Sequence, residues 1–144
     1  MNLFGTMEVS GSALAAERWR AEVVSANMAN AGTTRTPQGG AYRRQLVVFR
    51  APATARFPLM LARLEARAQP GVRVDGVVPD ASPLPRRYEP GHPDADAAGY
   101  VTYPNVNPVL EMTDLLSAVR AYQLNISAVQ AAKSMIQQSL QILI

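Results

Sequence analysis

The chain has 144 residues, of which 48% are hydrophobic and 17% are charged, with a formal net charge of +3 and no cysteine. This length fits one compact unit, or one unit with a small insert, and the lack of cysteine excludes a disulfide framework and a thiolate metal site. The basic residues are scattered without interleaved aromatic residues, so we expect no nucleic-acid partner. No apolar run reaches the roughly 20 residues of a spanning helix, so we expect no direct membrane insertion.

The first segment, residues 3–31, is predicted to be a helix, because apolar residues recur on one face at a spacing of seven. The predicted interface residues on that face are Met7, Leu14, Ala21, Val24 and Met28. Asn30 and Gly32 suit a left-handed cap at its end. Asn27 and Asn30 are interpreted mainly as capping residues. The N-terminal segment as a whole does not resemble a secretory signal peptide.

The middle of the chain, residues 35–108, is predicted to be a β-rich insert. Strands are expected where β-branched and aromatic residues gather, at 42–50, 71–78 and 100–103. Residues 82–93 contain four prolines and must be extended or turning. Residues 51–69 fit either a short helix or an irregular strand, and we expect a variable loop there.

A long helix is predicted for the last segment, residues 109–144. It is expected to begin there because Pro104 and Pro108 prevent an earlier start. Its apolar residues follow alternating steps of three and four, interrupted once at Lys133. These predicted interface residues are Met112, Leu115, Val119, Tyr122, Ile126, Val129, Ile136, Leu140 and Leu143. Such a repeat predicts lengthwise packing against another helix in a left-handed supercoil.

The composition of this last helix is unusual, because it has only four charged residues: Glu111, Asp114, Arg120 and Lys133. A helix with one side in water normally carries charges on that side. One interpretation is an ordinary core helix of a small monomer. The other is that further copies or other chains cover it, since so short a chain has little else to cover so long a rod.

The predicted fold class is therefore α+β, with the terminal helices pairing as an antiparallel coiled coil around a small β-rich insert. The expected domain division is residues 1–34, 35–108 and 109–144. Both chain ends would then lie at the same end of the molecule.

Candidate catalytic residues are few, because the chain has one histidine and no cysteine. The histidine, His92, stands near Asp94 and Asp96 in a proline-rich stretch. These three could hold a metal, but a rigid turn with aspartates bonding to backbone N–H groups is favoured. No phosphate-binding loop, nucleophile elbow or HExxH motif is present. We therefore expect no catalytic, cofactor-binding or metal-binding residue, and no enzyme.

Three stretches carry a resemblance: residues 10–36 with Asn-Met-Ala-Asn, residues 40–44, and residues 88–125 with Pro-Gly-His-Pro-Asp-Ala-Asp and Tyr-Pro-Asn-Val-Asn. The motif residues are Asn27, Asn30, Pro90, Gly91, His92, Pro93, Asp94, Tyr103, Pro104, Asn105, Asn107, Glu111 and Asn125. In order and spacing the chain resembles the flagellar rod and hook axial proteins, and among them the subunits of the proximal rod.

The resemblance implies a structural subunit of the flagellar basal body in the cell envelope, periplasmic in a two-membrane cell. It implies export by the flagellar type III apparatus and assembly into a hollow rod with copies of itself and other rod proteins. Contact at the junction of rod and membrane ring is a further expectation, and no cofactor is expected. The helices would form the inner wall, with Gln137 and Gln141 lining the channel.

Alternatives stay open at this point: another rod subunit, a coiled-coil adaptor, or a small enzyme or metal-binding module using His92, Asp94 and Asp96. Asn125 could bond across the helix seam or face a neighbouring subunit. A rod subunit should have largely disordered terminal helices before assembly, whereas an adaptor should be a folded helical dimer.

Overall fold

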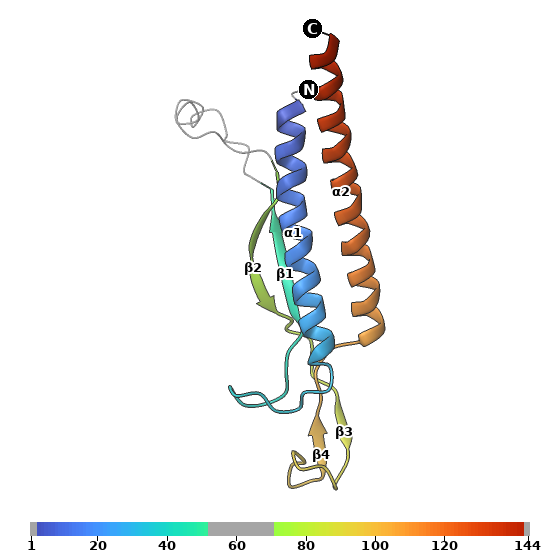
Figure 1. Ribbon diagram of the computed structural model, residues 1–144. Helices are drawn as coiled ribbons and strands as arrows, with labels where there is room; N and C mark the ends of the chain where they lie inside the picture. Colours follow the sequence, from blue (N-terminus) through green and yellow to red (C-terminus); the bar gives the residue numbers. More distant parts are fainter. Residues whose placement is uncertain (1–2, 52–70, 143–144) are drawn as a thin grey trace, which may run out of the picture. The chain divides into compact units, whose positions relative to one another are not determined.

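The computed structural model describes residues 3–51 and 71–142, and its elements follow the order helix, four strands, helix (Figure 1). The helices are α1 (Leu3–Ala29) and α2 (Pro108–Ile142). The strands are β1 (Gln45–Arg50), β2 (Arg73–Pro79), β3 (Arg86–Tyr88) and β4 (Tyr100–Thr102). This confirms the predicted α+β class, with two long terminal helices and a small β-rich insert. Within these ranges, neither helix is both long and apolar enough to span a membrane.

The chain forms two compact units, and each unit is assembled from separate stretches of sequence. The terminal unit consists of residues 1–19, 48–76 and 118–144. The central unit consists of residues 20–47 and 77–117. Each unit therefore contains a part of α1, a part of α2 and a part of strands β1 and β2. The predicted variable loop, residues 51–69, lies outside the described residues except for Ala51.

In the described part of the insert there are two separate two-stranded sheets, one made by β1 and β2 and the other by β3 and β4. Strands β3 and β4 are antiparallel, with Arg87 opposite Val101 and Tyr88 opposite Tyr100. Strand β3 lies inside the proline-rich stretch that was predicted to be extended, but its pairing was not predicted. Pro85 lacks an N–H group, yet its carbonyl accepts the N–H of Tyr103 at 2.8 Å, so a proline fits beside the first position of this short strand.

Helix α2 begins through local chemistry that the sequence shows directly. The side-chain oxygen of Asn107 accepts the N–H of Val109 at 3.0 Å, and its carbonyl accepts the N–H of Glu111 at 3.0 Å. Pro108 takes the first helical position, where a missing N–H leaves no hydrogen bond unmade. Asn107 is therefore the N-cap, one residue before the helix.

The end of α1 differs from the predicted left-handed cap. Within the described residues, only Gly39, Gly40, Gly71 and Gly99 have positive φ, so neither Asn30 nor Gly32 is left-handed. The chain leaves the helix through tight turns, in which Ala31 N–H reaches the carbonyl of Met28 at 3.2 Å. The Asn30 side chain donates at 2.9 Å to the carbonyl of Ala26, which also accepts the Asn30 N–H at 3.1 Å, so Asn30 bonds twice to the last turn of the helix.

In the terminal unit, the most buried side chains are small: Ser10, Ala16, Ala118 and Ala132. The Ser12 hydroxyl accepts the N–H of Val72 at 3.0 Å, just before β2. Gly71 precedes it with φ of +143°, and a Cβ there would lie 2.2 Å from Ser12 Oγ. Only glycine therefore fits where the strand approaches the helix this closely.

Candidate assembly surface and its polar anchor

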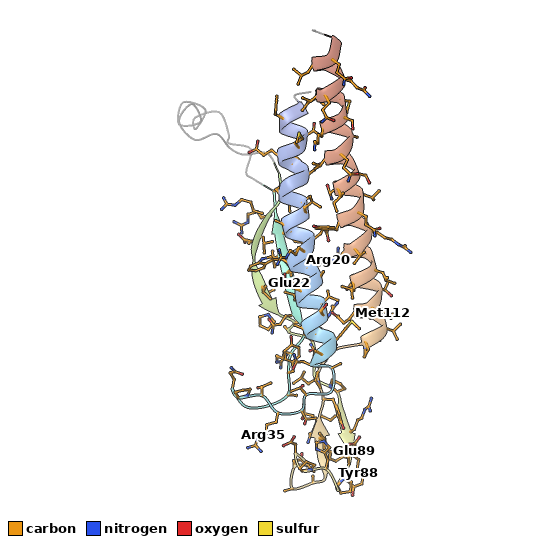
Figure 2. The ribbon with its side chains drawn as sticks, viewed as in Figure 1. Arg20, Glu22, Arg35, Tyr88, Glu89 and Met112 are labelled. Carbon is orange, nitrogen blue, oxygen red and sulfur yellow. The ribbon has the colours of Figure 1, made fainter. Side chains whose placement is uncertain are left out.

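Helix α2 carries large apolar side chains that the described chain leaves uncovered. Nine of them have relative exposures between 38% and 73%: Val109, Leu110, Met112, Leu116, Val119, Tyr122, Leu124, Met135 and Leu140. Met112, labelled on α2 in Figure 2, is 57% exposed. Large apolar side chains exposed in this number indicate that another macromolecule covers part of this helix. We call these nine residues the α2 apolar surface.

The most buried positions of α2 are Glu111, Ala118 and Ala132, which are seven and fourteen residues apart. They lie one residue before Met112 and Val119 of the predicted interface and before Lys133, which interrupts the repeat. A hydrophobic pattern counts large side chains, whereas close approach of two helices selects small ones. The most buried positions of α2 are thus mainly alanines, and the prediction, which considered large apolar residues only, did not include them.

The structure places the predicted interface residues at different depths. On α1, Val24 is buried, and Met7, Leu14, Ala21 and Met28 are half-buried. On α2, Leu115, Ile126, Val129 and Ile136 are half-buried, and Met112, Val119, Tyr122 and Leu140 are exposed. Leu143 lies outside the described residues. Gln137 and Gln141 are exposed, and the Asn125 amide donates to the carbonyl of Ala121 in its own helix at 2.9 Å.

In the central unit, a polar side chain of α1 is almost completely buried. Asn27 is 1% exposed, and its amide makes four hydrogen bonds. It donates to the Gln45 carbonyl at 2.9 Å and to Glu111 Oε2 at 3.0 Å, and it accepts from the Tyr42 hydroxyl and the Gln45 N–H, both at 2.9 Å. Its hydrogen-bonding capacity is therefore used on β1 and α2. The interpretation of Asn27 as a capping residue was wrong.

The carboxylate that Asn27 contacts is itself held by a guanidinium. Glu111 is 1% exposed, and Arg44 Nε donates to its Oε1 at 2.5 Å. Arg44 Nη2 also donates to Asp114 Oδ2 at 3.0 Å, and Arg20 Nη2 donates to Asp114 Oδ1 at 3.3 Å. A buried carboxylate is tolerated when both of its oxygens have donors, as they do here.

We call this group the polar anchor, and its members are Arg20, Asn27, Tyr42, Arg44, Glu111 and Asp114. It joins the last turns of α1, the approach to β1 and the first turns of α2 within one unit. Burial, and then the negative charge of Glu111, raise the pKa of Tyr42 above its ordinary value of 10.0. The neutral phenol therefore keeps its hydrogen bond to Asn27 in ordinary buffers.

Sequence reasoning singled out Asn27 and Glu111 as motif residues but gave them no contact, and it gave Tyr42 and Arg44 no role. One signal was available, because Glu111 is one of only four charged residues in this apolar helix. A carboxylate on the inward side of such a helix requires a cation from elsewhere in the chain.

The motif at residues 89–103 forms a compact turn in the central unit. The Asp96 carboxylate accepts the N–H groups of Ala98 and Tyr100, both at 2.9 Å, and pairs with Arg86. The Tyr100 N–H and then the Ala98 N–H lower the pKa of Asp96. The Tyr103 hydroxyl donates to Glu89 Oε2 at 2.8 Å, which raises the pKa of Tyr103.

The other motif residues of this turn are also engaged within the chain. Asp94 accepts the Thr34 hydroxyl at 2.7 Å and lies 3.7 Å from Arg35, while its N–H donates to His92 Nδ1 at 3.1 Å. Among the residues with described placement, no three His, Cys, Asp or Glu side chains gather in a way that could hold a metal ion. The geometry of the motif is that of a rigid turn, and the Asn105 side chain ties it to β1 by accepting the Arg44 N–H at 2.8 Å.

Both motif-bearing ends of the chain match known protein families. Residues 7–35 match the family described as "Flagella basal body rod protein", and residues 97–142 match "Flagellar basal body rod FlgEFG protein C-terminal". The two segments include Asn27 and Glu111, the centre of the polar anchor. The class of protein that these features define is the flagellar rod proteins.

Curated relatives identify the family within that class. The chain is 42% identical to the flagellar basal-body rod protein FlgC of Borreliella burgdorferi and 38% identical to that of Bacillus subtilis, with 99% of each chain covered in both cases. It is 40% identical to FlgC of Salmonella typhimurium, with 97% of each chain covered. The chain belongs to the FlgC family of flagellar basal-body rod proteins. It is thus a structural rod subunit, as the sequence motifs predicted.

Proposed function

We propose that this subunit polymerises, with copies of itself and with other rod proteins, into the proximal part of a hollow rod, and that it has no catalytic activity. The observation that carries this proposal is the α2 apolar surface, in a helix with only four charged residues. Complete burial of one such side chain contributes about 1.5–3 kcal/mol. Covering this surface with neighbouring subunits is therefore a sufficient driving force for polymerisation.

The exposed uncharged side chains near the end of α2 support a role in the channel wall. Gln137 and Gln141 are exposed, and no residue after Lys133 in this helix is charged. Amide groups offer a passing unfolded chain neither a fixed charge nor a large apolar surface. We assign Gln137 and Gln141 to the channel lining, and the β-rich insert, residues 35–108, to contacts outside the helical wall of residues 1–34 and 109–144.

The place of action that this function requires is the cell envelope. The chain would be exported unfolded by the flagellar type III apparatus and would reach the periplasm in a two-membrane cell. There it would join the rod near the junction with the membrane ring. The resemblance to rod proteins and the FlgC relatives support this assignment.

Circular dichroism combined with sedimentation of the purified chain tests the proposal. A polymerising subunit should sediment as a monomer in dilute buffer, with much less helix than α1 and α2 contain, and should gain helix as it assembles. A stable, fully helical dimer that does not grow with concentration would contradict the proposal and would favour a coiled-coil adaptor.

A further inference from the structure

Within residues 3–51 and 71–142, four charged side chains of the terminal unit form no ion pair: Glu8 on α1, Arg73 on β2, and Arg120 and Lys133 on α2. All four are exposed, and Glu8 is the single acid among them. A carboxylate that becomes covered during assembly needs a cation, because an unpaired buried charge is costly. A second copy of the chain carries such cations.

Glu8 lies in an exposed line of α1 that consists of Phe4, Glu8, Gly11, Ala15 and Trp19. Residues three and four positions apart share one face of a helix, so these five side chains lie along the same face. Phe4 is 69% exposed and Trp19 is 50% exposed, whereas Gly11 and Ala15 between them are small enough for another helix to approach closely. We call these five residues the α1 outer face.

Lys133 is the only lysine of the chain, and it interrupts the apolar repeat of α2. Other members of that repeat are incompletely covered, because Val119 is 41%, Tyr122 is 38% and Leu140 is 57% exposed. A single polar residue within an apolar repeat sets the register in which two helices pair. This side of α2 therefore combines apolar surface with one cation that has no partner among the described residues.

The spacing of two aromatic residues fits a pairing of Glu8 with Lys133. Within the terminal unit α1 and α2 run in opposite directions (Figure 1), and copies in a rod share one direction, so α1 of one copy meets α2 of the next as antiparallel helices. Each residue advances a helix by about 1.5 Å, so residues at equal distances from the pair face each other. Trp19 lies eleven residues after Glu8, and Tyr122 lies eleven residues before Lys133. These two exposed aromatic side chains therefore meet in this register.

The two arginines of the unit do not give a contact of this kind. Arg73 lies on a strand and not on either helix. Arg120 lies outside the repeat, and the residue eleven positions before it is Val109, which belongs to the central unit. Of the three cations, Lys133 alone keeps both the charge pair and the aromatic pair within one compact unit of each copy.

We propose that the α1 outer face of one copy binds the Lys133 side of α2 in a second copy, with Glu8 paired to Lys133 and Trp19 against Tyr122. The contact joins different faces of identical chains, so each copy has one face free for a further copy and the contact can repeat beyond a dimer. The ion pair selects the register of neighbouring copies. This proposal rests on the assembly function above and specifies how two copies of the subunit meet.

Zero-length crosslinking with a carbodiimide in isolated basal bodies tests the proposal, because Lys133 is the only lysine. We expect dimers and larger covalent oligomers of the chain, in which mass spectrometry finds the Lys133 amine joined to the Glu8 carboxyl group. Lys133→Arg keeps the charge and should lower this product at least tenfold. Adding Arg120→Lys to Lys133→Arg is the matched control and should not restore a product with Glu8.

Three results of this crosslinking would overturn the proposal. They are a Lys133 product with another carboxylate or with a different protein, products that stop at the dimer after exhaustive reaction, and no product from incorporated subunits. Absence of the unaltered chain from basal bodies would instead contradict the proposed rod function.

Charge exchange provides the second test. Glu8→Lys and Lys133→Glu should each lower the amount of subunit in basal bodies about tenfold, because like charges then face each other, and the double variant should restore it. Both side chains are exposed in the single chain, so thermal unfolding of each variant should match that of the parent. Full incorporation of Lys133→Glu, or no restoration in the double variant, overturns the proposal.

Discussion

The two units of this chain are stabilised in different ways. The central unit contains the polar anchor, in which a buried amide and a buried carboxylate are fully bonded by the chain's own residues. The terminal unit has a core of small side chains and exposes Val119, Tyr122, Leu124, Met135 and Leu140 on α2. Directional contacts thus fix the first unit from within, whereas the buried side chains of the second are small. Both units carry part of the α2 apolar surface, because Val109, Leu110, Met112 and Leu116 belong to the central unit.

The largest loss of stability is expected when Glu111 is replaced. Glu111→Ala leaves Arg44 as a partly buried cation and Asn27 with an unpaired donor, so we expect a loss of about 3–5 kcal/mol in the stability of the central unit. Hydrogen exchange of the amides in residues 20–47 measures it. The control Glu8→Ala removes an exposed carboxylate and should change stability by less than about 0.5 kcal/mol. Equal effects of the two changes would contradict the anchor.

A smaller loss is expected for Asn27→Ala, about 1–3 kcal/mol, because Glu111, Tyr42 and the Gln45 backbone lose buried hydrogen-bond partners. Asn30→Ala in the same motif is the matched control. Its side chain donates to the Ala26 carbonyl, which also accepts the Asn30 N–H, and it accepts the Thr33 hydroxyl at 3.2 Å, so we expect at most about 1 kcal/mol. Chemical denaturation compares the two. If Asn30→Ala lowered the stability more than Asn27→Ala, the buried hydrogen bonds of Asn27 would not be the main contribution of this motif to stability.

Leu124→Asp should separate folding from assembly. Leu124 is 72% exposed in the terminal unit, so the change should alter the stability of the isolated chain by less than about 0.5 kcal/mol. Incorporation into rods should nevertheless be lost, because an unpaired carboxylate would be buried against a neighbour. Motility and the amount of subunit in purified basal bodies measure this, with Leu124→Met as the tolerated control. A motile Leu124→Asp strain would remove Leu124 from the assembly surface.

The smallest expected effect is a pH dependence from Tyr42. Its pKa is higher in the folded chain than the ordinary value of 10.0, so its contribution to stability is fully present below that pH. The contribution is lost as the pH rises from 10.0 through the folded pKa, because the unfolded chain releases the proton first. Stability measured by denaturation between about pH 9 and 11 should therefore fall more steeply in the parent than in Tyr42→Phe. Parallel curves would show that folding does not raise the pKa of Tyr42.

Local chemistry made the elements predictable from the sequence. Pro104 and Pro108 placed the start of α2 within one residue, and the spacing of apolar residues predicted both helices. The anchor was not predictable in this way, because the contact of Asn27 with Glu111 depends on how distant segments pack. Strand β3 escaped prediction because three residues among prolines carry no periodic signal. The most buried positions of α2 lie one residue before the predicted ones, because the prediction counted large apolar residues and the buried residues Ala118 and Ala132 are small.

The polar anchor also orders events in time. Arg20 and Asp114 are 94 positions apart in the chain, and Asn27 and Glu111 are 84 apart. Closing so long a loop costs entropy before any contact rewards it. A polypeptide emerging N-terminus first cannot complete this cluster until Asp114 is free, so a product that ends before that residue lacks these contacts. Closure of the cluster therefore requires that the segments on both sides of the insert are present.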